Sequence, residues 1–380
     1  MNLSKPRIIY LVTSPISANV FGLLQIRSLF QHGFNVSLVV GQGSLNSELY
    51  KYVDSIYVNQ NFNRRISLIR DVKSIIQLCI IFFRVKPNVV IYSTPKAAFL
   101  GAIAAFITLT KIRIYQIWGI RWQHLSGFKL LLVRSADFLA IKLSTNVTVV
   151  SQSALELLNY KASKGKVGVL GVGSTVGVDA KIFYPKFTNN KSSNKKIMGY
   201  AGRIARDKGI DKLIDLFLSL SASVNNLYLE IIGIIDQDDK ISDKNLEILN
   251  SHPNIKLVPN LSQLELASHM QNWDIQIFLS EREGLGNVIL EAGACGIPTF
   301  CWDIVGTRDA VPTTKQNFLI PYGDLQTLET SVIKYLEAPL SFDDRIELAN
   351  WYEDNFGQQK VLNDFVTFID ELLGVYNERK

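Results

Sequence analysis

Cysteine is scarce in this chain of 380 residues, which argues against small domains stabilised by disulfides or by a structural zinc ion. The three cysteines, Cys79, Cys295 and Cys301, are unevenly spaced and show no paired metal-ligand spacing. Neither a disulfide framework nor a zinc ribbon fits this pattern. We therefore expect a protein of a reducing compartment.

Long apolar runs are also missing. The uncharged runs at residues 74–83 and 97–110 span ten and fourteen residues, whereas a membrane-spanning helix needs ~20. The apolar run near the N-terminus, residues 8–12, is too short for the core of a secretory signal peptide. These absences predict a cytoplasmic chain. A Ser-His-Asp order, a His-Glu-x-x-His motif and a P-loop are absent as well.

Acidic residues are rare in the first half of the chain. Residues 1–190 contain 22 Lys/Arg and 6 Asp/Glu, for a net charge of +16, while residues 191–380 contain 18 and 28, for −10. A basic half can attract nucleic acid, an anionic membrane or a phosphorylated ligand. Because no aromatic-interleaved basic patch or recognition module occurs in it, a non-catalytic nucleic-acid-binding protein is the weaker interpretation, and we expect no nucleic-acid partner.

One segment of the basic half allows two interpretations. Six basic residues surround the apolar stretch at residues 75–83: Arg64, Arg65, Arg70, Lys73, Arg84 and Lys86. A helix there could lie in a membrane interface with its basic margin toward anionic headgroups. A buried core helix with solvated ends would be apolar nearly all round in the same way. Both readings stay open at this point.

The remaining composition is that of a folded α/β protein. Apolar residues make up 47% and charged residues 19%, and at about 150 residues per domain the length predicts two domains. Short apolar runs alternate with helical stretches, as in parallel strands joined by crossover helices. The predicted strands are residues 7–13, 35–40, 56–58, 89–92, 112–118, 147–150 and 166–170, then 197–201, 227–232, 255–258, 275–279, 299–302 and 318–320. A polar, turn-rich stretch at 185–195 separates the two groups and predicts a linker between doubly wound domains at 1–184 and 196–357.

A candidate anion site follows the predicted strand 197–201. Gly202 and Arg203 come directly after the strand, Lys208 lies five residues on, and a helix begins after Gly209. Two cations beside a helix N-terminus can bind a pyrophosphate. A solvated basic loop is the alternative.

A second candidate site follows the predicted strand 275–279. The loop contains Glu283 and leads through Gly284, Leu285, Gly286 and Asn287 into a helix that carries Glu291. Glycines let a ligand approach the backbone, and amides at a helix start can donate to phosphate or hydroxyl oxygens. Glu291 can accept both hydroxyls of a ribose, while Glu283 can reach an attached sugar. The alternative is a surface loop with scattered acids.

Together, Arg203 with Lys208 and Glu283 with Glu291 resemble the donor site of the retaining GT-B glycosyltransferases of family 4, whose hallmark is a Glu-x7-Glu segment. Further segments are similar to bacterial members that build O-antigens and capsules: residues 94–98, 118–121, 171–174 with 177–179, and 306–310. The resemblance implies two Rossmann-like domains facing across a cleft, an N-terminal acceptor-side domain and a C-terminal domain that binds nucleotide sugar. The last helix, 358–380, would pack back on the N-terminal domain.

The resemblance also implies roles for the site residues. Arg203 and Lys208 would hold the donor diphosphate and, with Glu283, form the catalytic set. The donor-binding set would be Gly202, Gly284, Leu285, Gly286, Asn287 and Glu291. Ser14, Arg121 and His124 would lie on the acceptor side. The implied reaction moves a hexosyl or N-acetylhexosaminyl group, from a UDP-sugar by preference, to a polyprenyl-diphosphate-linked glycan at the inner face of the cell membrane. It needs no metal and no cofactor.

Two features and one alternative qualify this interpretation. The loop after the first strand, residues 13–19, lacks the paired glycines that many family members carry. Asp236 and Asp238 form an Asp-x-Asp, which could hold a divalent cation but also suits a solvated loop. A sugar-nucleotide epimerase of the same fold would share nucleotide binding but would need a proton-abstracting pair facing the sugar.

Overall fold

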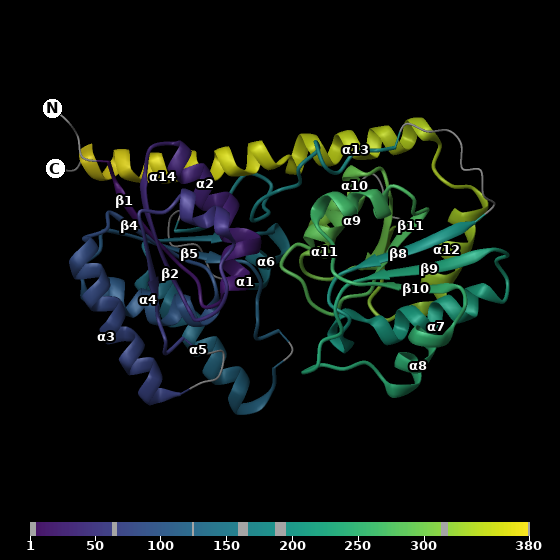
Figure 1. The fold of residues 1–380 in the computed structure, drawn as a ribbon, viewed down its shortest axis with the longest axis horizontal. Helices are drawn as coiled ribbons and strands as arrows, with labels where there is room; N and C mark the ends of the chain where they lie inside the picture. The colour runs from purple at the N-terminus through teal and green to yellow at the C-terminus, as the bar shows by residue number, and fades with distance from the viewer. Residues whose placement is uncertain are drawn as a thin grey trace. The chain divides into compact units, whose positions relative to one another are not determined.

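The computed structural model describes residues 5–62, 67–123, 125–158, 166–186, 195–312 and 318–378. The chain forms two compact units (Figure 1). Unit 1 comprises Met1–Val176 together with Gln359–Lys380, and unit 2 comprises Gly177–Gln358. The predicted fold class of two parallel-sheet α/β domains is confirmed, and every predicted strand is found with bounds that differ by at most two residues.

Unit 1 is built on a seven-stranded parallel sheet in the order β3-β2-β1-β4-β5-β6-β7. Its strands are β1 (Arg7–Leu11), β2 (Asn35–Val40), β3 (Ser55–Val58), β4 (Val89–Tyr92), β5 (Ile112–Ile117), β6 (Asn146–Val149) and β7 (Val167–Val169). Its helices are α1 (Pro15–Ser17), α2 (Leu23–Gln31), α3 (Leu68–Val85), α4 (Pro95–Ile107), α5 (Gly127–Leu143) and α6 (Gln152–Leu158). A π-helical turn, Ala18–Gly22, precedes α2, and a 3-10 turn, Ser47–Lys51, precedes β3.

The last helix, α14 (Gln358–Glu378), completes the core of unit 1. Its residues Phe365, Val366 and Ile369 are buried in one cluster with Ile8 of β1 and Val36 of β2. Strands β1 and β4 are almost wholly buried apolar segments, as expected for parallel strands covered by helices on both faces. Helices α3, α4 and α5 pack side by side as another layer of this unit.

Unit 2 is built on a six-stranded parallel sheet in the order β10-β9-β8-β11-β12-β13. Its strands are β8 (Lys196–Ala201), β9 (Leu227–Ile232), β10 (Ile255–Val258), β11 (Ile275–Phe278), β12 (Thr299–Trp302) and β13 (Leu319–Ile320). Its helices are α7 (Ile210–Ser221), α8 (Asp243–Ser251), α9 (Gln263–Met270), α10 (Asn287–Ala294), α11 (Thr307–Ala310), α12 (Leu325–Glu337) and α13 (Phe342–Phe356), with a 3-10 turn at Arg206–Lys208.

The division between the units falls earlier than residue 184. Residues 177–184 belong to unit 2, where the Val178 N–H donates to the Phe356 carbonyl (2.8 Å) and Gln271 Nε2 donates to the Tyr184 carbonyl (3.0 Å). These two hydrogen bonds, one between backbone groups and one from a side chain, hold the segment against unit 2 before the polar stretch begins, and the hydropathy of the sequence does not reveal them. Most of the predicted linker, residues 187–194, lies outside the described residues, as do Arg64 and Arg65.

Within the described ranges, no helix has both the length and the hydropathy needed to cross a membrane.

Candidate functional site

The two candidate loops of unit 2 follow neighbouring strands. Strands β8 and β11 pair at the centre of the sheet, and the chain proceeds from β8 to β9 on one side and from β11 to β12 on the other. Ligands of doubly wound sheets bind outside the carboxyl ends of the strands at such a reversal of strand order. The topology therefore places the loop containing Arg203 and the loop containing Glu283 at one edge of one sheet.

A close backbone approach brings these loops into contact. Gly209, with φ +71°, begins α7, and a Cβ at this position would overlap the carbonyl oxygen of Leu279 at the end of β11. The Glu281 N–H donates to the Asp207 carbonyl (2.9 Å) across the same gap. Glycine is required here because both the dihedral angle and the space exclude a side chain. Lys208 is thereby held against the loop that follows β11.

Lys208 and Glu283 form an ion pair that joins the loops. Lys208 Nζ lies 2.6 Å from Glu283 Oε1 and 3.3 Å from Ser280 Oγ. Both charged side chains are only about 15% exposed. A short, largely buried pair of this kind fixes both groups.

Arg203 is oriented by two carboxylates. Its guanidinium pairs with Asp236 and lies 3.2 Å from Asp207 Oδ2, while its side chain remains 49% exposed. Asp207 also accepts from Arg282 at 2.9 Å. Burial opposes ionisation of Asp207, but the hydrogen bond from Arg282 and the charges of Arg203 and Lys208 outweigh it and hold the pKa of Asp207 below its ordinary value. Sequence reasoning did not assign a role to Arg282 or to Asp207. Their positions next to Glu283 and Lys208 in the sequence were the signal that could have indicated one.

Asp236 is engaged with Arg203 in the structure. Its carboxylate also accepts the Asp238 N–H at 2.9 Å, and these hydrogen bonds, that of Asp238 foremost, lower the pKa of Asp236. In the part of the chain that the structure describes, no group of three or more His, Cys, Asp or Glu side chains is placed to hold a metal ion.

Helix α10 begins beside this network. Gly286 occupies its N-cap with φ +87°, and no side chain caps the helix start. The Ile289 N–H donates to the Gly286 carbonyl (2.9 Å), which leaves the N–H groups of Asn287 and Val288 for a ligand. Leu285 is buried, whereas Gly284 and Asn287 are half-buried. Gly306, which precedes α11, packs so closely on this loop that a Cβ there would lie 2.7 Å from the Gly284 carbonyl oxygen.

Glu291 lies one turn into α10 and stands apart from the ion-pair network. Desolvation by burial raises the pKa of its carboxyl to about 8. Among the described residues, we find no hydrogen bond or ion pair to this side chain. The site thus contains a half-buried carboxyl group that is available to a ligand's donors.

The acceptor-side candidates lie in unit 1. Ser14 follows β1, and its Oγ accepts the Ile16 N–H (3.2 Å) at the start of α1. Arg121 is exposed after β5, and His124 lies outside the described residues. In the loop without paired glycines, the Thr13 hydroxyl binds Thr94 Oγ1 (2.6 Å) and accepts the Ala97 N–H (3.2 Å) at the start of α4, which sequence reasoning did not predict.

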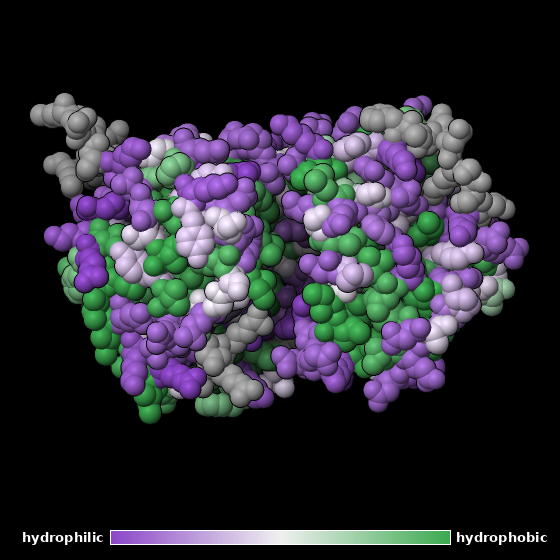
Figure 2. All heavy atoms as spheres, in the orientation of Figure 1, coloured by the Kyte–Doolittle hydropathy of each residue, from purple (hydrophilic) through white to green (hydrophobic). Residues whose placement is uncertain are grey.

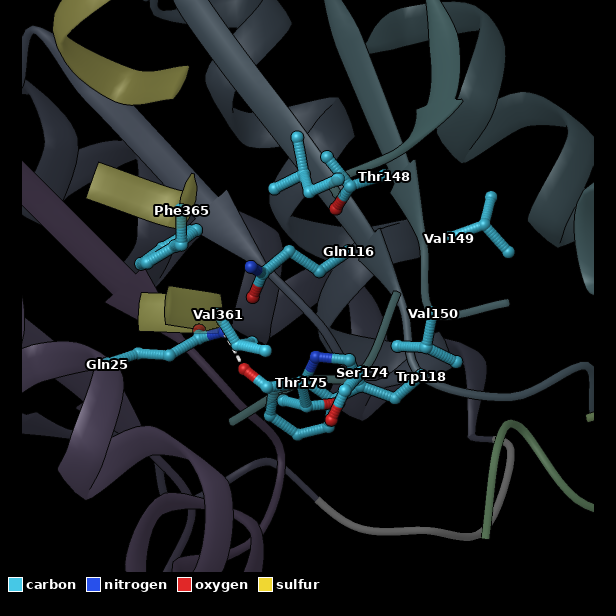
Figure 3. A pocket seen from close by; sticks show the side chains of 11 residues that line it. Gln25, Gln116, Trp118, Thr148, Val149, Val150, Ser174, Thr175, Val361 and Phe365 are labelled. Atoms are coloured by element: carbon cyan, nitrogen blue, oxygen red, sulfur yellow. Dashed lines mark hydrogen bonds between the residues drawn. The ribbon is translucent and has the colours of Figure 1, made fainter. Parts of the chain in front are cut away.

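Unit 1 also contains a small pocket that sequence reasoning missed (Figure 3). Gln116 and Thr148 line it from β5 and β6, and Val361 and Phe365 line it from α14. Gln25 closes one side by donating to the Thr175 carbonyl at 2.8 Å. Polar residues inside otherwise apolar strands were the sequence signal for this pocket.

Comparisons with known proteins identify the family. The model of glycosyl transferases group 1 matches residues 185–352. The capsular polysaccharide biosynthesis glycosyltransferase CapM of Staphylococcus aureus is 30% identical over 365 residues, which cover 93% of this chain and 92% of that protein. The UDP-Gal:alpha-D-GlcNAc-diphosphoundecaprenol alpha-1,3-galactosyltransferase of Escherichia coli is 23% identical over 395 residues, which cover 98% of this chain and 97% of that protein.

A solved structure agrees with this at the level of the fold. HepE of Anabaena, in complex with UDP and glucose, superimposes with a TM-score of 0.75 at 17% identity, covering 96% of this chain and 100% of that one. The matched family model spans both candidate loops of unit 2. The chain therefore belongs to the group 1 glycosyltransferases and has the GT-B fold.

Proposed function

We propose that this glycosyltransferase moves a sugar from a nucleotide-diphosphate sugar, with UDP as the favoured nucleotide, to a polyprenyl-diphosphate-linked cell-surface glycan, with retention at the anomeric carbon. The observation that carries the proposal is the meeting of Arg203, Lys208 and Glu283 at one sheet edge, beside the uncapped start of α10. The E. coli relative's name, which gives a UDP-Gal donor and a diphosphoundecaprenol acceptor, supports it.

The donor diphosphate would bind at Arg203, Lys208 and the N-terminus of α10. A guanidinium has five N–H donors, and the pairs with Asp207 and Asp236 fix its plane while leaving further donors for phosphate oxygens. The helix N-terminus adds amide donors and a favourable dipole. Fixed donors of this kind stabilise the charge that develops on the leaving phosphate.

The sugar and the ribose would be held by the two glutamates. Glu283, fixed by Lys208, would accept from donor-sugar hydroxyls, and Glu291 would accept from the ribose. The backbone of Gly202, Gly284, Leu285, Gly286 and Asn287 would contact the donor. As the bond from the anomeric carbon to the leaving oxygen breaks, the acceptor oxygen bonds to that carbon on the same face. The acceptor's proton passes to the leaving phosphate oxygen, so no separate base, metal or cofactor takes part.

The finer assignments follow the resemblance to family 4 enzymes of O-antigen and capsule synthesis. We place Ser14, Arg121 and His124 on the acceptor side, and the transferred group is a hexosyl or N-acetylhexosaminyl unit. The enzyme would work as a peripheral protein at the cytoplasmic face of the membrane, where a lipid-linked acceptor is found. Unit 1 would then serve the acceptor and unit 2 the donor.

A panel of nucleotide sugars tests this proposal. The purified chain is incubated with each sugar nucleotide, with and without a synthetic polyprenyl-diphosphate-linked sugar, and the products are followed by NMR. We expect slow hydrolysis of one donor alone, and faster transfer with retained anomeric configuration when the acceptor is present. An epimerised sugar nucleotide as the product would instead assign the chain to sugar-nucleotide epimerisation.

The same assay tests metal dependence. Because Arg203 and Lys208 supply fixed positive charge, we expect transfer to continue in EDTA at an unchanged rate. Loss of activity in EDTA and its return with manganese would require a role for Asp236 and Asp238 as metal ligands.

A further inference from the structure

Unit 1 exposes a concentrated apolar surface. Twenty-five large apolar side chains are exposed among the described residues, and thirteen of these lie between residues 68 and 138, in α3, at the end of α4 or in α5. These helices pack side by side. Hydrophobic residues gather at the lower left margin of the space-filling view, where the ribbon view places α3 (Figures 1 and 2). Exposed apolar side chains that gather on adjacent helices, rather than singly over a surface, are typical of an interaction site.

Helix α3 has one packed and one unpacked apolar face. Leu78, Ile81 and Phe82 are buried against the unit. The exposed apolar side chains recur at intervals of three and four residues and therefore share one side of the helix. They are Ile69, Val72, Ile76, Ile80 and Phe83. The helix is thus a core element on one side and presents apolar side chains to the solvent on the other.

The end of α4 and the outer side of α5 extend the patch. Leu109, just past α4, is 82% exposed and adopts φ +54°, a left-handed conformation in which glycine is usual after a helix. An exposed leucine thus occupies a backbone conformation that costs energy for any residue other than glycine. On α5, Phe128 and Leu131 are also exposed.

The exposed charge on these helices has one sign. Residues 67–145 contain eleven Lys/Arg but only two carboxylates, Asp71 and Asp137. Asp71 is paired with Lys96 at 2.7 Å, and Asp137 is buried and accepts the Tyr115 hydroxyl at 2.9 Å. The exposed charged side chains are therefore all basic: Arg70, Lys73, Arg84, Lys86, Lys111, Arg121, Lys129, Arg134 and Lys142.

We infer that this α3–α5 surface, defined by the exposed residues of α3, the end of α4 and α5, docks onto an anionic lipid bilayer. Apolar side chains such as Ile76 and Ile80 enter the boundary of the acyl chains, and the surrounding Lys and Arg side chains meet anionic headgroups. A second copy of the chain fits poorly, because two basic faces repel. The inference rests on the proposed function for its purpose, which is to bring the enzyme to a lipid-linked acceptor.

Vesicle co-sedimentation of the full chain tests this surface. Vesicles of phosphatidylcholine alone are compared with vesicles of equal parts phosphatidylcholine and phosphatidylglycerol, over a range of salt concentrations. We expect binding only to the anionic vesicles, and weaker binding as salt rises. Lys73→Ser with Arg84→Ser should weaken partitioning about 30-fold, since each basic side chain near the surface contributes a factor of about five. Ile76→Ser with Ile80→Ser should weaken it by tenfold or more.

Matched controls use exposed residues outside this surface. Lys51→Ser with Lys244→Ser removes two exposed charges, and Leu264→Ser with Leu325→Ser removes two exposed leucines from unit 2. Both controls should bind vesicles as the parent chain does. Equal binding to the two kinds of vesicle, binding to neither, or no effect of the surface variants would overturn the inference. So would self-association in light scattering that Ile76→Ser with Ile80→Ser abolishes.

Hydrolysis of donor in vesicle-free solution separates this inference from the proposed function. All of the surface variants should hydrolyse the donor at the parent rate, which also shows that they fold. A chain that binds anionic vesicles but hydrolyses no sugar nucleotide would overturn the donor chemistry and leave the docking surface in place. A chain that hydrolyses a sugar nucleotide but binds no vesicles would overturn the docking surface and leave the donor chemistry in place.

Discussion

At the scale of single residues, the ion pairs of Arg203 decide how the anion site works. Asp207 and Asp236 hold the guanidinium from one side, and the half-exposed side chain presents the rest of its donors to a ligand. Arg206, three residues further on, is 72% exposed; its guanidinium lies 3.9 Å from Asp239 Oδ1 and makes a long hydrogen bond to the Lys240 carbonyl (3.4 Å). The two arginines share a loop but differ in how firmly they are positioned.

Arg203→Ala should therefore reduce transfer by about 10²–10³, the usual effect of removing one donor to the transition state, which costs about 2.7–4 kcal/mol. Arg206→Ala is the matched control and should keep activity within a factor of two to three. The measurement is kcat/KM for transfer, with circular dichroism as a check of folding. Parent-like turnover by a folded Arg203→Ala protein would contradict the phosphate site.

Glu291 gives a second prediction at this scale, on stability against pH. Its folded pKa of about 8 lies above the unfolded value near 4.5, so the stability it contributes is complete below pH 4.5 and is lost as pH rises through 8. Glu291→Gln should accordingly stabilise the ligand-free protein at pH 8, by up to about 4 kcal/mol, and much less at pH 5. Urea unfolding at both pH values measures this. An equal effect at both would show that the carboxyl is ionised in the folded chain.

The same substitution should impair catalysis while it stabilises the fold. Above pH 8, where the Glu291 carboxyl is ionised, a neutral amide accepts hydroxyl hydrogen bonds less strongly than the carboxylate does, so we expect transfer by Glu291→Gln to fall there while the free energy of unfolding rises. Opposite signs for stability and activity are the mark of a residue kept for its ligand.

At the scale of elements, helix α14 ties the end of the chain to the beginning of unit 1. Ile369 is fully buried among side chains of β1, β2 and α2. Ile369→Ala should lower the free energy of unfolding of unit 1 by about 2–5 kcal/mol, as for other large-to-small core changes. Glu371→Ala, on the same helix but exposed, should change it by less than about 0.5 kcal/mol. Calorimetry on both variants makes the comparison.

The sequence predicted elements better than it predicted their partners. Strands such as β4 and β9 were predicted with the right bounds, because continuous apolar runs between turn residues leave little choice. The two sides of α3 could not be told apart, since a helix that is apolar nearly all round has no face singled out by its pattern. The meeting of Lys208 with Glu283 spans 75 residues and depends on the pairing of β8 with β11, so local patterns do not contain it.

Contacts made by polar side chains were the least predictable part of the site. Asp207 and Asp236 each suit a loop residue, a metal ligand or an ion-pair partner, and only the fold selects among these roles. Thr13 is similar: its hydroxyl bonds Thr94, across the sheet from β1 to β4, where the expected glycines are missing. A sequence shows which polar side chains are present, but which of them contact one another depends on the order of the strands in the sheet.

At the scale of the whole molecule, two units with separate sheets should unfold as two transitions rather than one. Because the donor-site residues lie in unit 2, UDP at 100 times its Kd should stabilise that unit by about 2.7 kcal/mol and raise its Tm by about 5–10 °C. Ile369→Ala should move the other transition. Scanning calorimetry with and without UDP checks this, and a shift confined to the transition that Ile369→Ala moves would place the nucleotide in unit 1.

The return of the chain to unit 1 has a consequence for synthesis on the ribosome. Unit 2 ends at Gln358, whereas unit 1 takes in residues from 359 onward, including Phe365, Val366 and Ile369 of its core. Domains usually fold in the order in which they emerge, from the N-terminus on. Here unit 1, which is translated first, must wait for residues that are translated after unit 2. Its nascent sheet therefore stays incomplete, and needs protection from aggregation, while unit 2 already folds.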